Sequence, residues 1–345
     1  MILFVSDYLE GCLPQILDRL TQTNFEQTPG YGEDPHCAHA ADLIRTACDS
    51  PNASVHFLVG GTQTNATVIS SILKPFQGVI CADTGHINTH ETGAVEHTGH
   101  KVLDLPTADG KLTAAMLRET MHLHVTDANR EHSVQPGIVY ISFPTERGTI
   151  YSRNELAALS AECKKWGLPL YLDGARLGYG LCSPECDLTL ADIASLTDVF
   201  YIGGTKQGAL FGEAVVFSNP ILAKDFRYAI KQNGGLLAKG RLLGVQYEVL
   251  FEDGLYFKAA QKAIDAAMTI RAALIEKGVG FLNDSTTNQI FPILPNSAIK
   301  ALRREFSIDN WGEVDSTHTA VRICTSWATT EDNVRAFVDA ISTIL

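Results

Sequence analysis

The chain has 345 residues, 45% of them hydrophobic and 19% charged, an ordinary balance for a globular protein whose length predicts a large domain and a smaller one. Its formal net charge of −12 argues against a nucleic-acid groove or an anionic membrane surface as a partner. No apolar stretch approaches the roughly 20 residues of a membrane span, and the N-terminus has no basic lead of the kind that signal peptides carry.

Seven short apolar runs predict β-strands. Most are rich in Val, Ile, Phe and Tyr and are continuous rather than alternating, as in strands covered on both faces of a mostly parallel sheet. The last two runs flank Lys206 with no room for a helix, so we expect them to pair antiparallel. The runs span residues 54–59, 79–82, 102–105, 138–143, 168–172, 199–202 and 214–217.

Helix-like stretches at residues 62–73, 152–166 and 188–196 lie between these runs. The second stretch begins with Ser152 and has Glu155 three residues on, the pattern of a capping box. Because strands and helices alternate, we expect an α/β fold with helices on both faces of a seven-stranded sheet.

The pattern changes after about residue 219, where helices come first and short strands follow. This order predicts a small α+β domain, and we expect a division into residues 1–245 and 246–345. The predicted helices span 221–231, 236–251, 256–277 and 330–344, and the predicted strands span 289–294 and 320–324.

Eight cysteines are present, and several lie in apolar contexts that are typical of reduced core residues. Cys182 and Cys186 are spaced C-x-x-x-C, but no second pair completes a zinc site. A reducing, cytoplasmic compartment is therefore expected.

An acid and a lysine each follow a buried run. Asp173 comes after the fifth run and Lys206 after the sixth, within Gly-Gly-Thr-Lys-Gln-Gly. Pyridoxal phosphate chemistry needs such a pair, since a lysine holds the cofactor aldehyde as a Schiff base and an acid keeps the pyridine nitrogen protonated.

Other polar residues follow the strands at the edge where open α/β sheets bind ligands. Gly61 and Thr62 open a helix, so they form either a phosphate cradle or an ordinary turn and cap. His86 either stacks on the pyridine ring, contacts a substrate hydroxyl, or is a hydrogen-bonded loop histidine. His90 and Glu91 follow it, but no carboxylate–histidine spacing here matches a metal site, and we expect no metal.

Two arginines complete the candidate set. Arg176 is close enough to Asp173 in sequence to reach the ring's phenolate oxygen, unless the two form a structural pair. Arg322 lies in an apolar run and needs a partner. That partner is either a substrate α-carboxylate, gripped by two hydrogen bonds, or an internal carboxylate.

Jointly these residues resemble the threonine aldolases of the β-eliminating-lyase group, which have the aspartate-aminotransferase-like fold of pyridoxal phosphate enzymes. The resemblance covers nearly the whole chain. Its marks are the segment 31–35, Gly61-Thr62, His86 with 91–93, the segment 173–177, Lys206, and 321–322 with 325–327.

The resemblance implies a role for each matching position. The cofactor is expected to be bound by Lys206 covalently, Asp173 at the ring nitrogen, Arg176 at the ring oxygen, His86 by stacking, and Gly61 and Thr62 at the phosphate. Ser6 and Arg322 are expected to bind the substrate carboxylate. Tyr31 and the cation Lys239 are expected to come from a neighbouring subunit, which implies an obligate dimer or a dimer of dimers, as in a homotetramer.

Two features depart from many members of the group. Glu146 takes the place of a histidine that contacts the substrate's β-hydroxyl, and the lysine follows Gly-Gly-Thr rather than Ser-Leu-Ser. The implied reaction is retro-aldol cleavage of a small β-hydroxy-α-amino acid to glycine and an aldehyde, with His86 or a nearby water or carboxylate as base. The alternatives are β-elimination, transamination or racemisation with the same cofactor, a non-catalytic relative, and a metal-dependent aldolase.

Overall fold

The computed structural model describes all 345 residues and contains one seven-stranded sheet in the order β2-β8-β7-β6-β5-β3-β4. All seven predicted strands are present. β8 runs antiparallel to both neighbours, as predicted for the runs that flank Lys206, and the other neighbouring pairs are parallel. The strands are β2 (Ser54–Leu58), β3 (Gln77–Ala82), β4 (Val102–Leu105), β5 (Gln135–Ser142), β6 (Leu170–Asp173), β7 (Val199–Gly203) and β8 (Glu213–Phe217).

Helices cover both faces of this sheet, which confirms the predicted α/β architecture. One face packs against α3 (Gly61–Ile72), α4 (His86–Thr89), α5 (Ala94–His97) and α10 (Phe226–Gln232). The other face packs against α1 (Pro14–Gln22), α2 (Pro35–Ala47), α6 (Ala114–Thr126), α7 (Arg153–Trp166), α9 (Leu190–Leu196) and α11 (Arg241–Phe251).

Local sequence sets several helix starts. Ser152 and Glu155 form the predicted capping box of α7, and Thr189 forms a second one on α9. The sequence analysis did not predict α1, α2 or α6; α6 buries only Leu117 and Met121, so its apolar pattern is sparse. The helix predicted from residue 236 starts instead at Arg241.

The seven-stranded sheet with its helices is one layer of the structure. The C-terminal part of the chain and its first residues form a second, here called the C-terminal layer. β1 (Ile2–Leu3) pairs in parallel with β11 (Phe306–Ser307), and Phe4 lies in the core of this layer. The expected division at residue 245 falls inside α11. The remaining elements are α8 (Leu177–Leu181), α12 (Leu255–Glu276), β9 (Gln289–Ile290), β10 (Ile293–Pro295), α13 (Asn296–Leu302), β12 (Asp309–Glu313), β13 (His318–Cys324), α14 (Glu331–Ile344) and short 3₁₀ turns at Arg130–His132, Pro220–Ala223 and Glu252–Gly254.

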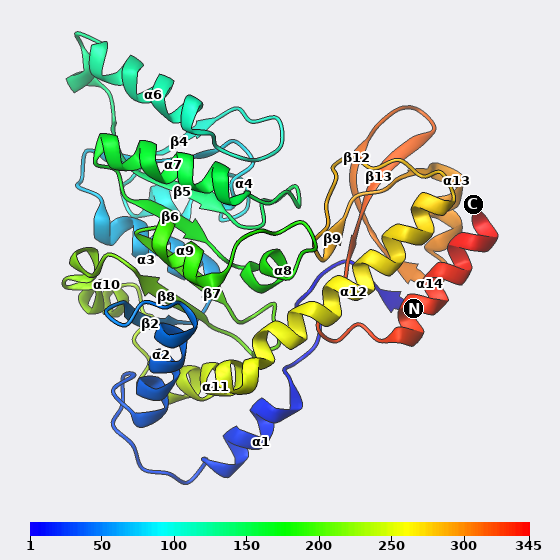
Figure 1. Cartoon of the computed structure of the whole chain (residues 1–345), viewed down its shortest axis with the longest axis horizontal. Helices are drawn as coiled ribbons and strands as arrows, with labels where there is room; N and C mark the ends of the chain where they lie inside the picture. The colour runs from blue at the N-terminus through cyan, green and yellow to red at the C-terminus, as the bar shows by residue number, and fades with distance from the viewer.

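The long helix α12 joins the two layers. It starts next to α11 and runs to the C-terminal layer, where both ends of the chain lie (Figure 1). Its residues Ala267, Ile270 and Leu274 belong to the core of that layer. None of the helices combines the length and the apolar character that crossing a membrane requires.

The loop after β6 touches β7 at the carboxyl edge of the sheet. A Cβ atom on Gly174 would overlap the Tyr201 carbonyl oxygen, and one on Gly203 would overlap the backbone of Ala175. Only glycine permits this close approach, which brings the loop after Asp173 against the strand that leads to Lys206.

We expect Gly174→Ala to lower the free energy of unfolding by about 2 kcal/mol, because the new methyl group has to displace backbone. Gly280→Ala is the matched control, since a Cβ there meets no atom within 4 Å. Urea unfolding followed by circular dichroism measures both. Equal stability of Gly174→Ala and the wild type would contradict the predicted contact.

Candidate active site

A cavity of about 380 Å³ opens at the carboxyl edge of the sheet, the size of a small-molecule site. The residues that line it come mostly from the ends of β2, β3, β5, β6 and β7, as expected for an open α/β sheet. The predicted residues among them are Gly61, Thr62, His86, Asp173, Arg176 and Lys206.

The Lys206 side chain carries a free amine into this cavity. Its Nζ makes no hydrogen bond or ion pair within the chain and lies 6.0 Å from the centre of the Tyr8 ring. Burial, together with the positive charge of Arg176, lowers the pKa of Lys206. A larger share of this amine is therefore neutral and nucleophilic than of an exposed lysine.

Asp173 lies buried at the end of β6, where four hydrogen bonds hold its carboxylate. Tyr201 donates to Oδ1 at 2.5 Å and Tyr140 to Oδ2 at 2.6 Å, while the Asn65 amide and the Ala175 N–H each donate at 3.0 Å. Burial alone would raise the pKa of Asp173, but the charge of His86 and these hydrogen bonds outweigh it and lower the pKa. The side chain is therefore a fixed anion.

The pleat of the sheet explains this cluster. Ser142 pairs with Asp173 in neighbouring strands, and Tyr140 pairs with Tyr171 two residues earlier, so all four side chains share one face. The sequence analysis missed Tyr140, Tyr201 and Asn65. A signal was present, because tyrosines recur in three consecutive apolar runs and a buried hydroxyl needs a partner.

The first turn of α3 faces the same cavity. The helix begins at Gly61, and no side chain caps its N-terminal N–H groups. Thr62 is exposed and adds a hydroxyl at the cavity wall. Free N–H groups at the start of a helix bind anions, and phosphate groups in particular.

His86 is linked to Asp173 through two polar side chains. The Nδ1 atom of His86 lies 2.7 Å from Oε1 of the buried Glu91, and the Asn65 amide bonds the same oxygen at 2.7 Å and Asp173 at 3.0 Å. Burial favours the neutral ring, but the hydrogen bond to Glu91 and the charge of Asp173 outweigh it and raise the pKa of His86. Its Nε2 makes no hydrogen bond within the chain.

Glu146, which we expected in place of a histidine of the family, lines the cavity together with His86. Its Oε1 accepts a hydrogen bond from Ser142 Oγ at 2.5 Å and another from the backbone N–H of His86 at 3.0 Å. Its Oε2 makes no hydrogen bond within the chain. Burial raises the pKa of Glu146 above the ordinary value for a glutamate.

Arg176 reaches the cavity but forms an ion pair with Asp7, a residue that the sequence analysis missed. Its Nε and Nη2 atoms donate to the two oxygens of Asp7 at 2.6 and 2.9 Å. The structural pair considered with Asp173 does not form. Because the third nitrogen, Nη1, makes no hydrogen bond within the chain, one donor remains for a ligand.

Arg322 and Ser6 do not line this cavity. Arg322 donates from Nη2 to Asp309 at 2.6 Å and to the Val5 carbonyl at 2.9 Å, so the internal ion pair considered from the sequence is present. Its guanidinium also lies 5.2 Å from the centre of the Trp311 ring. The Nε of Arg322 and the Oγ of Ser6 are both buried without a partner.

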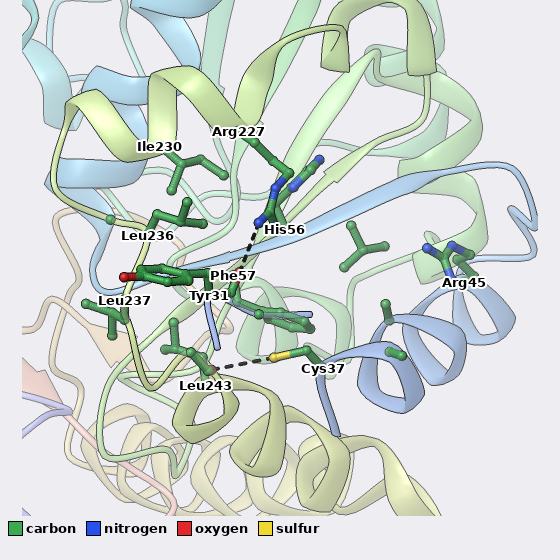
Figure 2. A pocket seen from close by; sticks show the side chains of 16 residues that line it. Tyr31, Cys37, Arg45, His56, Phe57, Arg227, Ile230, Leu236, Leu237 and Leu243 are labelled. Atoms are coloured by element: carbon green, nitrogen blue, oxygen red, sulfur yellow. Dashed lines mark hydrogen bonds between the residues drawn. The ribbon is translucent and has the colours of Figure 1, made fainter. Parts of the chain in front are cut away.

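Tyr31 and Lys239 lie away from Lys206 in the same chain. Tyr31 lines a separate cavity of about 200 Å³ together with Leu236 and Leu237, and Figure 2 shows this cavity. Its backbone has a positive φ of 60°, and its N–H donates to the Ala238 carbonyl at 3.3 Å. Lys239 follows in this loop and is exposed.

The residues around Lys206 fit pyridoxal phosphate, the cofactor implied by the sequence. They offer a free buried amine for the aldehyde, a fixed anion at Asp173 for the ring nitrogen, and an uncapped helix start for the phosphate. The free Nη1 of Arg176 suits the ring oxygen.

Comparisons with known proteins agree on one family. Residues 4–296 match the model of the beta-eliminating lyases. The low specificity L-threonine aldolase of Pseudomonas sp. (strain NCIMB 10558) is 33% identical, with 99% of this chain and 97% of that protein covered. The protein of the same name from Pseudomonas aeruginosa is also 33% identical, with 87% of this chain and 86% of that protein covered.

Solved structures confirm the predicted fold. The threonine aldolase of Leishmania major has a TM-score of 0.96 and 46% identity, with 100% of this chain and 99% of that chain covered. An aspartate aminotransferase mutant from Thermus thermophilus has a TM-score of 0.70 and 13% identity, with 100% of this chain and 92% of that chain covered, so it shares the fold. Because the family match spans most of the sequence and the first Pseudomonas relative aligns along nearly all of it, the chain belongs to the beta-eliminating lyase family.

Proposed function

We propose that this protein uses pyridoxal phosphate to cleave a β-hydroxy-α-amino acid of the L-threonine type into glycine and an aldehyde. The observation that carries the proposal is the free amine of Lys206 in one cavity with the fixed anion of Asp173. The names of the Pseudomonas and Leishmania relatives support this substrate class.

Pyridoxal phosphate, when bound, supplies an aldehyde that condenses with amines and a ring that accepts the electrons of a breaking Cα–Cβ bond. Asp173 would hold a proton at the ring nitrogen, and Tyr140 and Tyr201 keep its carboxylate in place. Arg176 would donate to the ring oxygen from Nη1. The N–H groups at the start of α3 and the Thr62 hydroxyl would bind the phosphate.

His86 takes the proton of the substrate's β-hydroxyl at Nε2, and its Nδ1 stays bonded to Glu91. Glu91 also holds the ring in position for stacking. Glu146 is the second candidate base, because its Oε2 is free at the cavity wall. Arg322 and Ser6 bind the substrate carboxylate, which gives a partner to the unpaired Nε and Oγ atoms.

The active site is completed by a second subunit in this proposal. Tyr31 and Lys239 lie apart from the Lys206 cavity, so they act in the site of a neighbouring chain within a dimer or a homotetramer. We also propose a large domain at 1–245, a small domain at 246–345 and a cytoplasmic location. All eight cysteines are free thiols, as suits a reducing compartment.

Purified protein with pyridoxal phosphate is expected to convert L-threonine or L-allo-threonine to glycine and acetaldehyde. A panel of L and D, threo and erythro β-hydroxy amino acids, analysed for glycine and aldehyde, defines the preferred substrate. Formation of a keto acid and ammonia would instead identify an eliminating lyase.

Lys206→Ala should abolish turnover and the visible absorbance of lysine-bound cofactor, while the surface control Lys74→Ala keeps both.

The rate of cleavage should fall as the pH drops below the pKa of His86, because the protonated ring accepts no proton. Glu91 raises this pKa, so Glu91→Gln should shift the acid limb of the kcat/KM profile to lower pH by about one unit. An acid limb that stays in place in Glu91→Gln, or that persists in His86→Asn, would rule out His86 as the base.

Mixing two inactive variants tests the shared site. In a hybrid dimer with shared sites, Tyr31→Ala and Lys206→Ala fall in the same site, which leaves the other site intact. Random mixing should restore about a quarter of the wild-type rate of glycine formation. If unfolding and refolding the variants together restores no activity, Tyr31 acts within its own chain or outside the active site.

A further inference from the structure

Glu213 stands between the two loops that surround the cavity. It is the first residue of β8, where its backbone pairs with Leu58 at the end of β2 and with Gly203 at the end of β7. β2 continues into the start of α3, and β7 continues into the segment with Thr205 and Lys206. A carboxyl group therefore lies between the expected phosphate site and the catalytic lysine.

Only half of this carboxyl group has a partner. The Thr205 hydroxyl donates to Oε1 at 3.0 Å, and the Gly212 N–H donates in turn to that hydroxyl at 3.0 Å. The Oε2 atom is buried without any hydrogen bond, although Glu213 lines the cavity and is only 4% exposed. An unpaired buried oxygen is costly, so its position at a ligand cavity indicates a partner that arrives with the ligand.

Glu213 forms no ion pair. Arg176 is bound to Asp7, and Lys206 makes no ion pair with Glu213. Burial raises the pKa of Glu213 to about 8, although the hydrogen bond from Thr205 and the charge of Lys206 oppose the rise. The other titratable groups that face it are Lys206, Asp173, Tyr171, Tyr201, Tyr247 and Tyr256.

The four tyrosines stay neutral in this pH range, because burial raises each tyrosine pKa well above its ordinary value. Glu213 is thus predominantly a neutral acid near pH 7, with a proton to donate. A phosphate oxygen is a strong acceptor for that proton, whereas the ionised side chain would repel a phosphate dianion.

We propose that Glu213 binds the cofactor phosphate as a neutral carboxylic acid that donates a hydrogen bond from Oε2. This inference rests on the proposed use of pyridoxal phosphate and adds a proton-dependent phosphate ligand to it. The affinity is present below the pKa of Glu213 and is lost as the pH rises through it, because the carboxylate offers no donor and adds a like charge.

Binding of pyridoxal phosphate and of phosphate-free pyridoxal to the apoprotein separates this contact from all others. From about pH 7 to about pH 9, wild-type affinity for pyridoxal phosphate should fall by about tenfold more than affinity for pyridoxal. Glu213→Gln keeps a donor that does not ionise, so its two affinities should change in parallel. The exposed control Glu276→Gln should behave as the wild type.

Glu213→Ala should weaken pyridoxal phosphate binding at neutral pH by about tenfold and leave pyridoxal binding unchanged. Equal loss of both ligands would show a merely structural role, and an alkaline loss that persists in Glu213→Gln would overturn the proposal. These binding constants do not depend on turnover. Failure of the proposed aldolase function would appear separately, as absence of glycine and aldehyde from fully loaded wild-type protein.

Discussion

The active site depends on one buried anion, the Asp173 carboxylate at the end of β6. Two tyrosine hydroxyls, an amide and a backbone N–H hold it, so a charge that burial disfavours is maintained among apolar strands. Asn65 and Glu91 extend this network to His86. The Asp173 carboxylate and the His86 imidazole thus belong to one hydrogen-bonded unit.

Sheet topology brings the other groups to this anion. Parallel neighbours end at the same edge, and the single antiparallel strand β8 starts there, so loops distant in sequence surround one cavity. The strand order also places the candidate groups on different sides of the cavity. The amine at Lys206 and the start of α3 lie on either side of β8, while His86 and Glu146 approach from the side of β3 and β5.

The sequence predicted the parts of the fold that have a local signal. Continuous apolar runs gave the seven strands, and the short interval around Lys206 gave the antiparallel pair. The run 289–294 splits into β9 and β10 at Pro292, which has no N–H to donate to a ladder. Lys206 and Asp173 stood out because each follows a strand. Asp7 did not, because its partner Arg176 is 169 residues away and no spacing rule links them.

The N-terminal segment connects the two layers through a very short path. Phe4 is fixed in the core of the C-terminal layer, and Asp7, three residues later, is fixed to Arg176 at the cavity. Three residues span at most about 11 Å, so the two anchored residues cannot move farther apart than this. A rotation of the C-terminal layer that moves Phe4 away from the sheet would therefore pull Asp7 and, through it, the Arg176 guanidinium. A fusion partner attached at Met1 would exert its force on the same short segment, close to Phe4.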